Sequence, residues 1–310
     1  MLQIMDLSKK YKNVQAVSGV NMYLEKGEIV GLLGPNGAGK STTISMLSSL
    51  IIPSSGDVRL HNESIVKQPE KIRHILGVVP QEIALYTDLT AEENLQFFGK
   101  IYGLQGTTLK LRINEVLEQI GLTDRRKDLV KTFSGGMKRR LNIGVALLHT
   151  PEMIIMDEPT VGIDPQSRNY ILETVKRLNR EQGLTVLYTS HYMEEVEFLC
   201  DRIYIMDQGH IIASGTKEEL KNILSSENTI IIKVERIKDE LIRVLKADPH
   251  IRQVQVQDQK ISIIVPKEEN LFQAITHYAE ETKTKLISIE VKAPTLEDVF
   301  LHLTGRALRD

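Results

Sequence analysis

A glycine-rich stretch near the start of the chain has the residue types needed to hold a phosphate. Residues 34–41 read Gly-Pro-Asn-Gly-Ala-Gly-Lys-Ser after the apolar run 29–33, which fits G-x-x-x-x-G-K-[ST]. The glycines allow backbone N–H groups to face a phosphate without obstruction by side chains. Lys40 can reach the β- and γ-phosphates, and Ser41 can place its hydroxyl on Mg²⁺. The full pattern favours a nucleoside-triphosphate site over a glycine turn without a ligand.

A second candidate site lies where another apolar run ends in two carboxylates. Residues 153–156 are apolar and are followed by Asp157 and Glu158. Burying an ionised aspartate without a partner is costly, and a Mg²⁺ ion facing Asp157 removes that cost, as in the Walker B arrangement. Glu158 then points elsewhere and can orient a water molecule and accept its proton. The alternative is a strand that simply ends in two solvated charges.

A third segment, 134–136, reads Ser-Gly-Gly and precedes a helix with apolar periodicity. Ser134 can cap that helix, while the glycines leave N–H groups bare for an anion. Since the first loop already binds one triphosphate, a second anion site suggests a nucleotide shared between two molecules. An ordinary capped helix is the alternative interpretation of this segment.

The first two-thirds of the chain alternates apolar strands with helices. The predicted strands are 29–33, 58–60, 77–79, 153–156, 185–189 and 203–206, and the predicted helices are 42–50, 92–102, 109–120, 137–149, 168–181 and 193–199. Continuous apolar strands between such helices predict an α/β fold with a parallel sheet covered on both faces. Ligands of such sheets gather beyond the carboxyl ends of the strands, which places the first loop, Asp157 and His191 at one edge.

The pattern changes near residue 220. Beyond it the predicted order is β-α-β-β-α-β, which is the split βαβ or ferredoxin-like arrangement, followed by one more helix. The predicted elements are strand 229–234, helix 238–246, strands 251–257 and 260–265, helix 270–280, strand 286–291 and helix 296–303. We therefore expect a second, small α+β domain.

Composition and charge exclude several classes of function. The net charge is −2 among 310 residues, so there is no global electrostatic case for nucleic acid as a partner. The basic run 138–140 is better interpreted as a solvated helix face than as a nucleic-acid patch.

No apolar run approaches the roughly 20 residues that span a bilayer, and Met1–Asp6 lacks the features of a signal peptide. A single cysteine, Cys200, excludes a disulfide framework. We expect a cytoplasmic protein that reaches the membrane only through a partner.

Taken in order along the chain, these motifs resemble an ABC transporter ATP-binding subunit. The matching segments are the 34–42 loop, Gln81 in 78–81, the 134–136 signature, 157–158, 161–164 and 190–191. The resemblance covers roughly residues 1–220. It implies a P-loop NTPase fold in which an ABC ATPase domain, 1–220, contains a helical subdomain at about 85–150. The segment 221–310 is then a C-terminal accessory or regulatory domain.

The resemblance also implies the cofactors ATP and Mg²⁺ and a role for each matching residue. Tyr11 stacks on adenine, Gln81 senses Mg²⁺ and the membrane partner, Asp164 lies at the dimer seam, and His191 contacts the γ-phosphate. The nucleotide contacts are Tyr11, Gly34, Pro35, Asn36, Gly37, Ala38, Gly39, Lys40, Ser41, Thr42, Ser134, Gly135, Gly136 and Asp164. The catalytic residues are Lys40, Gln81, Glu158 and His191, and the Mg²⁺ ligands are Ser41, Gln81 and Asp157.

Two ATP molecules are implied between two such subunits, each bound by one subunit's loop and the other's signature. Phe133 and Met137 replace the Leu and Gln of the commonest signature, and Ile163 replaces a Leu, but the glycines remain. The signature variant and the tail 294–306 are similar to the daunorubicin-resistance-type exporter ATPases, whose members pair with separate membrane subunits. The segment 77–98, with the apolar stretch 83–86, is predicted to contact such a permease.

The function predicted from these observations is ATP hydrolysis coupled to export, in a homodimer or pseudo-dimer on the inner face of the cell membrane. The alternative is a soluble ABC ATPase acting on DNA or ribosomes. It is disfavoured because the segment between Gln81 and Ser134 is short and zinc-type cysteines are absent. A non-catalytic regulatory module is disfavoured because Lys40, Glu158 and His191 are all present.

Overall fold

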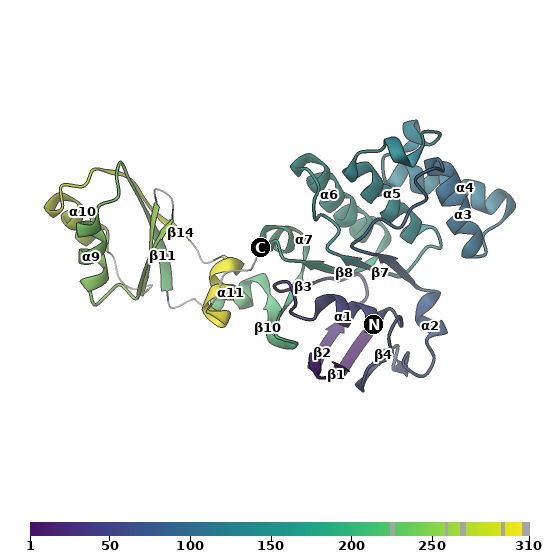
Figure 1. Cartoon of the computed structure of the whole chain (residues 1–310), viewed down its shortest axis with the longest axis horizontal. Helices are drawn as coiled ribbons and strands as arrows, with labels where there is room; N and C mark the ends of the chain where they lie inside the picture. Colours follow the sequence, from purple (N-terminus) through teal and green to yellow (C-terminus); the bar gives the residue numbers. More distant parts are fainter. Residues whose placement is uncertain (224–226, 258–259, 267–270, 293–294, 306–310) are drawn as a thin grey trace. The chain divides into compact units, whose positions relative to one another are not determined.

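The computed structural model describes residues 1–310 except 224–226, 258–259, 267–270, 293–294 and 306–310. The chain divides into two compact units, with the division between Thr216 and Lys217. Each unit has its own hydrophobic core. Figure 1 labels helices and strands of both units.

The first unit is built on a six-stranded sheet whose central strands are fully buried. Its order is β10 (His210–Thr216), β9 (Arg202–Asp207), β3 (Ile29–Leu33), β8 (Thr185–Ser190), β7 (Met153–Asp157) and β6 (Leu76–Val79). All pairs are parallel except β9 with β10. Every residue of β3, β7 and β8 is buried, which explains why these strands are continuous apolar runs rather than alternating ones.

Helices cover both faces of this sheet, as predicted. Side chains alternate between the faces of a strand, and β3 shows which helix lies on each. Gly31 lies against Val196 and Cys200, at the end of α7, while Val30 and Leu32 belong to the core cluster that contains α1. The helices of this unit are α1 (Lys40–Leu47), α2 (Glu70–Arg73), α3 (Ala91–Ile101), α4 (Gly106–Gln119), α5 (Gly135–Leu147), α6 (Pro165–Gln182) and α7 (Met193–Leu199), with 3₁₀ turns at Thr123–Arg125 and Val130–Thr132.

A second, antiparallel sheet lies in the same unit and was not predicted. It consists of β2 (Val14–Leu24), β1 (Leu2–Tyr11), β4 (Ser55–Leu60) and β5 (Glu63–Ser64). The predicted strand 58–60 is part of β4, so it was wrongly assigned to the parallel sheet. Strands β1 and β2 were missed because only one of their faces is buried, so their apolar residues alternate with polar ones.

Helices α5 and α6 start two and three residues earlier than predicted because polar residues cap them. Ser134 accepts a hydrogen bond from the Met137 N–H, so α5 begins at Gly135. Asp164 accepts one from the Ser167 N–H and is followed by a proline, so α6 begins at Pro165 rather than at 168. Both caps belong to segments singled out from the sequence.

Among the residues that the structure describes, no helix is both long and apolar enough to cross a bilayer.

The second unit has the predicted order β-α-β-β-α-β between two further helices. The elements are α8 (Lys217–Asn222), β11 (Glu227–Val234), α9 (Asp239–Ala247), β12 (Gln253–Gln257), β13 (Lys260–Pro266), α10 (Phe272–Glu281), β14 (Leu286–Lys292) and α11 (Leu296–Thr304). The four strands form an antiparallel sheet in the order β12-β13-β11-β14. Ile230, Ile232 and Ile263 on one face of the sheet share a core with Leu241 of α9 and Ile275 of α10.

Candidate active site

The glycine-rich loop connects β3 to α1 and takes a shape that depends on its glycines. Gly37 and Gly39 have positive φ angles of 80° and 108°, which side-chain-bearing residues adopt only with strain. A Cβ atom at Gly39 would also collide with the carbonyl oxygen of Ala16, at 2.6 Å. The loop conformation therefore depends on glycine at these positions, and it leads directly into the N-terminus of α1, where the helix dipole favours an anion.

A cavity of about 400 Å³ opens over this loop. Its lining comes from the loop, from the start of β2, from the β9–β10 turn and from two predicted catalytic residues: Val14, Gln15, Ala16, Pro35, Asn36, Gly37, Ala38, Gly39, Lys40, Ser41, Thr42, Gln81, Glu158, Gln208 and Gly209. The predicted phosphate loop and the predicted carboxylate Glu158 therefore line the same cavity. Its volume lies within the range typical of small-molecule sites.

Lys40 is buried in the floor of this cavity and is fully partnered. Its Nζ donates hydrogen bonds to the carbonyl oxygens of Gly34, at 2.7 Å, and Pro35, at 3.2 Å. It also lies 3.0 Å from Oε1 of Glu158, and both side chains are less than one-tenth exposed. The positive charge is held at the mouth of the loop, where an incoming phosphate can replace the carboxylate.

Asp157 and Glu158 lie at the carboxyl end of β7 and are both buried. The hydroxyl of Thr189 joins them, because it donates to Oδ1 of Asp157 at 2.8 Å and accepts from the backbone N–H of Glu158 at 2.9 Å. Glu158 has a φ of 44°, a left-handed conformation that costs a non-glycine residue about 1–3 kcal/mol. The hydrogen bond that the Glu158 N–H donates to the Thr189 hydroxyl holds this strained conformation.

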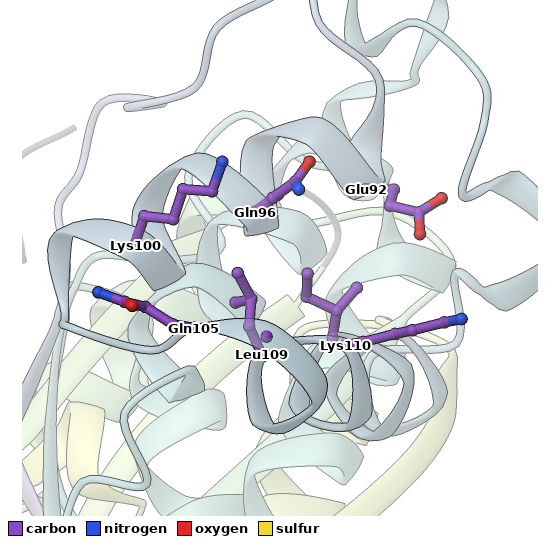
Figure 2. A pocket seen from close by; sticks show the side chains of 8 residues that line it. Glu92, Gln96, Lys100, Gln105, Leu109 and Lys110 are labelled. Atoms are coloured by element: carbon purple, nitrogen blue, oxygen red, sulfur yellow. The ribbon is translucent and has the colours of Figure 1, made fainter.

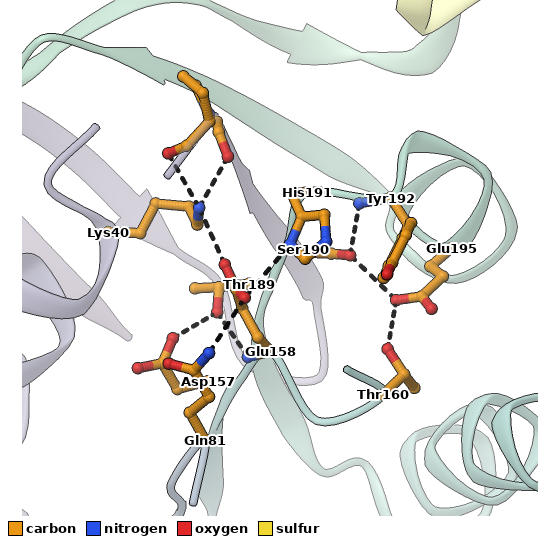
Figure 3. A network of polar contacts seen from close by, with 12 residues as sticks. Lys40, Gln81, Asp157, Glu158, Thr160, Thr189, Ser190, His191, Tyr192 and Glu195 are labelled. Carbon is orange, nitrogen blue, oxygen red and sulfur yellow. Dashed lines mark hydrogen bonds and ion pairs between the residues drawn. The ribbon is translucent and has the colours of Figure 1, made fainter. Parts of the chain in front are cut away.

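Two further predicted residues converge on the other oxygen of Glu158. His191 Nδ1 lies 3.2 Å and Gln81 Nε2 lies 3.5 Å from Oε2 (Figure 3). His191 follows β8 and Gln81 follows β6, so the strand ends bring together residues that are up to 110 positions apart. The arrangement can orient a water molecule at Glu158 and offer a hydrogen-bond donor to a phosphate.

The donor set around Asp157 suits a magnesium ion. Asp157 uses one oxygen for the Thr189 hydroxyl, and Ser41 presents a hydroxyl at the cavity lining. In the described part of the chain, no three His, Cys, Asp or Glu side chains are grouped as an all-protein metal cage. Mg²⁺ is typically bound through one or two carboxylates plus substrate phosphates and water, so this site fits Mg²⁺ delivered with a nucleotide.

The structure does not bring the remaining predicted nucleotide contacts to this cavity. Ser134 and Gly136 lie at the start of α5, and a Cβ on Gly136 would collide with Ser167 of α6. Asp164 caps α6, and the N–H of Ser167 bonded to its carboxylate lowers the pKa of Asp164. Tyr11, at the end of β1, is 45% exposed and is not part of the lining.

Arg139 is a functional candidate that sequence reasoning missed. The run 138–140 was interpreted as solvated, but Arg139 is only 4% exposed, so that interpretation is wrong for this residue. Its guanidinium donates to the carbonyl oxygens of Pro80, at 2.6 Å, and Gln81, at 2.5 Å, and burial lowers its pKa. Arg139 lies on the same face of α5 as Gly136 and Ile143, both buried, but an arginine at that spacing can also extend to solvent, so the spacing alone does not predict its burial.

A second cavity, of about 620 Å³, lies between α3 and α4 and is separate from this chemistry. Figure 2 shows Glu92, Gln96 and Lys100 of α3 facing Leu109 and Lys110 of α4. None of its lining residues belongs to the predicted nucleotide site, although Glu92 and Gln96 lie in the segment 77–98 predicted to contact a permease. Glu92 is already paired with Arg126. Although this cavity is larger, it lacks the phosphate-type loop and the carboxylate of Glu158 that line the first one.

Two family profiles match the chain. One described as "ABC transporter" matches residues 17–161, and one described as "ATP-binding protein DrrA1-3-like, C-terminal domain" matches residues 215–304. The chain is 53% identical to the linearmycin resistance ATP-binding protein LnrL of Bacillus subtilis (strain 168), over 100% of both chains. It is 36% identical to the daunorubicin/doxorubicin resistance ATP-binding protein DrrA of Streptomyces peucetius, over 98% of this chain and 92% of DrrA.

Solved structures match the first unit. A dimeric, post-hydrolysis structure of the ATP-binding cassette MJ0796 bound to ADP and Pi aligns with a TM-score of 0.64 and 28% identity. It covers 70% of this chain and 98% of the cassette. An ATP-binding subunit of an ABC transporter aligns with a TM-score of 0.65 and 31% identity, over 73% of this chain and 93% of that subunit.

Proposed function

The chain belongs to the ABC transporter ATP-binding proteins, in the group with a DrrA1-3-like C-terminal domain, and from that membership we propose that it hydrolyses ATP to drive export through separate membrane subunits. The observation that carries the proposal is the convergence of Lys40, Glu158 and His191 at the phosphate-type loop. The alternative of an ATPase acting on DNA or ribosomes loses its support, since the full-length relatives are named for drug resistance or for Nod factor export.

The contacts suggest how the site performs hydrolysis. Lys40 exchanges Glu158 for the β- and γ-phosphates of ATP, which frees the carboxylate. Glu158 then orients a water molecule and takes its proton as the water oxygen bonds to the γ-phosphorus. The bond from that phosphorus to the β–γ bridging oxygen breaks, and ADP and phosphate result. His191 donates a hydrogen bond to the γ-phosphate. Asp157 and Ser41, with Gln81 nearby, would hold Mg²⁺, which would neutralise charge on the phosphates.

A second subunit is proposed to complete the site. The bare helix start at 134–136 and the cap Asp164 do not line the cavity that contains Lys40. If these segments contact nucleotide, the nucleotide has to be bound by another copy or by a homologous subunit. The dimeric ADP- and Pi-bound relative supports that arrangement. Tyr11 is proposed to stack on adenine, because its cross-strand neighbour Val14 lines the cavity.

Contact with a permease is proposed at the segment that follows Gln81. Ile83 and Tyr86 are exposed, at 36% and 49%, and the Tyr86 ring packs on Phe97 of α3 at 4.8 Å between centroids. Exposed aromatic and aliphatic side chains beside a catalytic residue suit a docking surface. Such docking places the subunit on the cytoplasmic face of the membrane.

The C-terminal unit is proposed to have the ferredoxin-like arrangement, supported by the β-α-β-β-α-β order and the strand order β12-β13-β11-β14. We propose that it is an accessory domain that tunes subunit pairing. Relatives of the whole chain are named for resistance to linearmycin and to daunorubicin/doxorubicin and for Nod factor export. The exported compound is therefore proposed to be an antibiotic or a comparable secreted product.

Two variants test the proposed function. Lys40→Ala removes the cation facing the triphosphate, so it should weaken binding of a fluorescent ATP analogue and abolish phosphate release. Glu158→Gln should retain binding but stop hydrolysis, because an amide cannot accept the proton of water. It should also form an ATP-dependent dimer in size-exclusion chromatography with light scattering. Arg59→Gln, which loses an exposed ion pair in β4, is the control for unspecific effects. Wild-type turnover in Lys40→Ala would exclude the assigned site.

A further inference from the structure

A buried carboxylate that the proposed hydrolysis does not use lies behind the catalytic residues. Glu195 is in the first turn of α7 and is only 2% exposed. Three hydroxyl groups donate to its Oε2 atom: Thr160 at 2.8 Å, Tyr188 at 2.8 Å and Ser190 at 3.0 Å. Figure 3 shows the contacts of Thr160 and Ser190 with Glu195 beside the network formed by Lys40 and Glu158.

A fourth contact reaches Glu195 from α6. Nε of Arg168 lies 3.3 Å from Oε1, as an ion pair without a well-directed hydrogen bond. The same guanidinium lies 4.7 Å above the ring centre of Tyr192. Arg168 is one helical turn after Asp164, the cap of α6. Glu195 therefore touches the segment that is proposed to face the second subunit.

The other contacts belong to the two segments that carry Glu158 and His191. Thr160 follows Glu158 by two residues, and Ser190 directly precedes His191. The hydroxyl oxygen of Ser190 also accepts a hydrogen bond from the N–H of Tyr192 at 2.9 Å. The side chain of the residue before His191 therefore holds the backbone of the residue after it. Glu195 is thus bonded to the segments that carry both residues proposed to contact the reacting groups.

The burial of Glu195 determines how many hydrogen bonds its carboxylate needs. A carboxylate with so little exposure requires several donors, and a buried donor or acceptor left without a partner is costly. Burial, reinforced by the charge of Glu195, raises the pKa of Tyr188 well above its ordinary value, so its phenol stays protonated and donates. The three hydroxyl donors come from β8 and from the segment that follows β7. The cation, Arg168, comes from α6.

We propose that Glu195 is a positioning residue that joins the segments of Glu158, His191 and Asp164, so that the geometry of the catalytic pair depends on the position of α6. The proposal rests on the assignment of Glu158 and His191 to ATP hydrolysis. It adds a physical connection between the helix at the proposed subunit seam and the groups that act on the γ-phosphate.

The test is a steady-state ATPase measurement on the full-length chain carrying Glu195→Gln, which keeps the size of the side chain but removes its charge. We expect kcat to fall by about 10- to 100-fold, the effect of a small misplacement of catalytic groups. KM for ATP and binding of a fluorescent ATP analogue should stay within about twofold, because no contact to the phosphate loop is lost.

The matched control is Glu28→Gln. Glu28 is also a largely buried carboxylate paired with an arginine, Arg202 at 2.7 Å, but it precedes β3 and lies at the opposite end of the strand from the loop. It should lower thermal stability without lowering kcat by more than about twofold. If Glu195→Gln lowers kcat only as much as Glu28→Gln does, its role is structural and the proposal fails.

A double-variant cycle identifies the path. If Glu195 acts through Ser190, then Ser190→Ala added to Glu195→Gln should cause little further loss of kcat. Losses that multiply would overturn that connection. If Glu195→Gln does not fold, Ser190→Ala and Thr160→Val each test the idea alone, and wild-type kcat in both rejects it. If instead the proposed ATP hydrolysis is wrong, the wild-type chain and Lys40→Ala will show the same phosphate release. That result distinguishes failure of the proposed function from failure of the Glu195 proposal.

Discussion

The buried ion pair between Lys40 and Glu158 predicts that loss of the catalytic carboxylate will strengthen nucleotide binding. In Glu158→Gln the charge of Lys40 stays buried but loses its anionic partner at 3.0 Å. Breaking a buried pair from one side costs about 3–5 kcal/mol. Because two carbonyl oxygens still accept from Nζ, we expect the lower cost of about 2 kcal/mol.

This cost applies only while the phosphate site is empty. A loss of about 2 kcal/mol lowers the melting temperature of a unit of this size by about 4–8 °C. ADP supplies a β-phosphate to Lys40, so it should restore most of that loss. By linkage, its affinity for the variant should rise by about 30-fold. ADP is the chosen ligand because ATP-driven dimerisation would add its own stabilisation.

Thermal unfolding with and without ADP, together with calorimetric titration of ADP, measures both effects. Lys40→Met combined with Glu158→Gln should unfold at a higher temperature than Glu158→Gln alone, because no uncompensated charge remains buried. Equal ADP affinity for the wild type and Glu158→Gln would refute the reasoning, as would strictly additive stability losses in the double variant.

Other outcomes follow from the same structure. Thr189→Val leaves the Glu158 N–H unpaired, so unfolding should become easier by about 1–3 kcal/mol in denaturant titrations; an unchanged midpoint contradicts this. Arg139→Met removes the donors to both carbonyl groups at 80–81, so kcat should fall more than ADP affinity does. Ile83→Glu should abolish transport in vesicles at unaltered basal ATPase rate; full transport excludes the docking surface. Truncation after Thr216 should leave ATP binding intact but alter dimerisation measured by light scattering; loss of binding contradicts an accessory role.

The C-terminal unit packs its helices α9 and α10 against one face of the sheet. The opposite face would need cover only if it were apolar. The rows of side chains opposite the core face pair Gln255 with Ser262 and Ile231 with Glu290, so the face is largely polar. A polar face can remain in water. Any role in pairing must then depend on specific contacts rather than on apolar burial.

The sequence by itself determined the chemistry that is written in contiguous residues. The loop 34–41, the carboxylates 157–158 and the cap Ser134 each depend on local backbone geometry, and local geometry follows from neighbouring residue types. The buried parallel strands were also predictable, since a strand covered on both faces must be apolar at every position.

Only the tertiary structure decided which of these groups meet. Strand order brings Lys40, Glu158 and His191 together, and no local pattern encodes which strand ends are neighbours. The burial of Arg139 and Glu195 was likewise undetermined, because a charged residue on a helix can face solvent or a core. Which one it faces depends on the segments that pack there, here the carbonyl groups at 80–81 and three hydroxyl groups from β8 and the segment after β7.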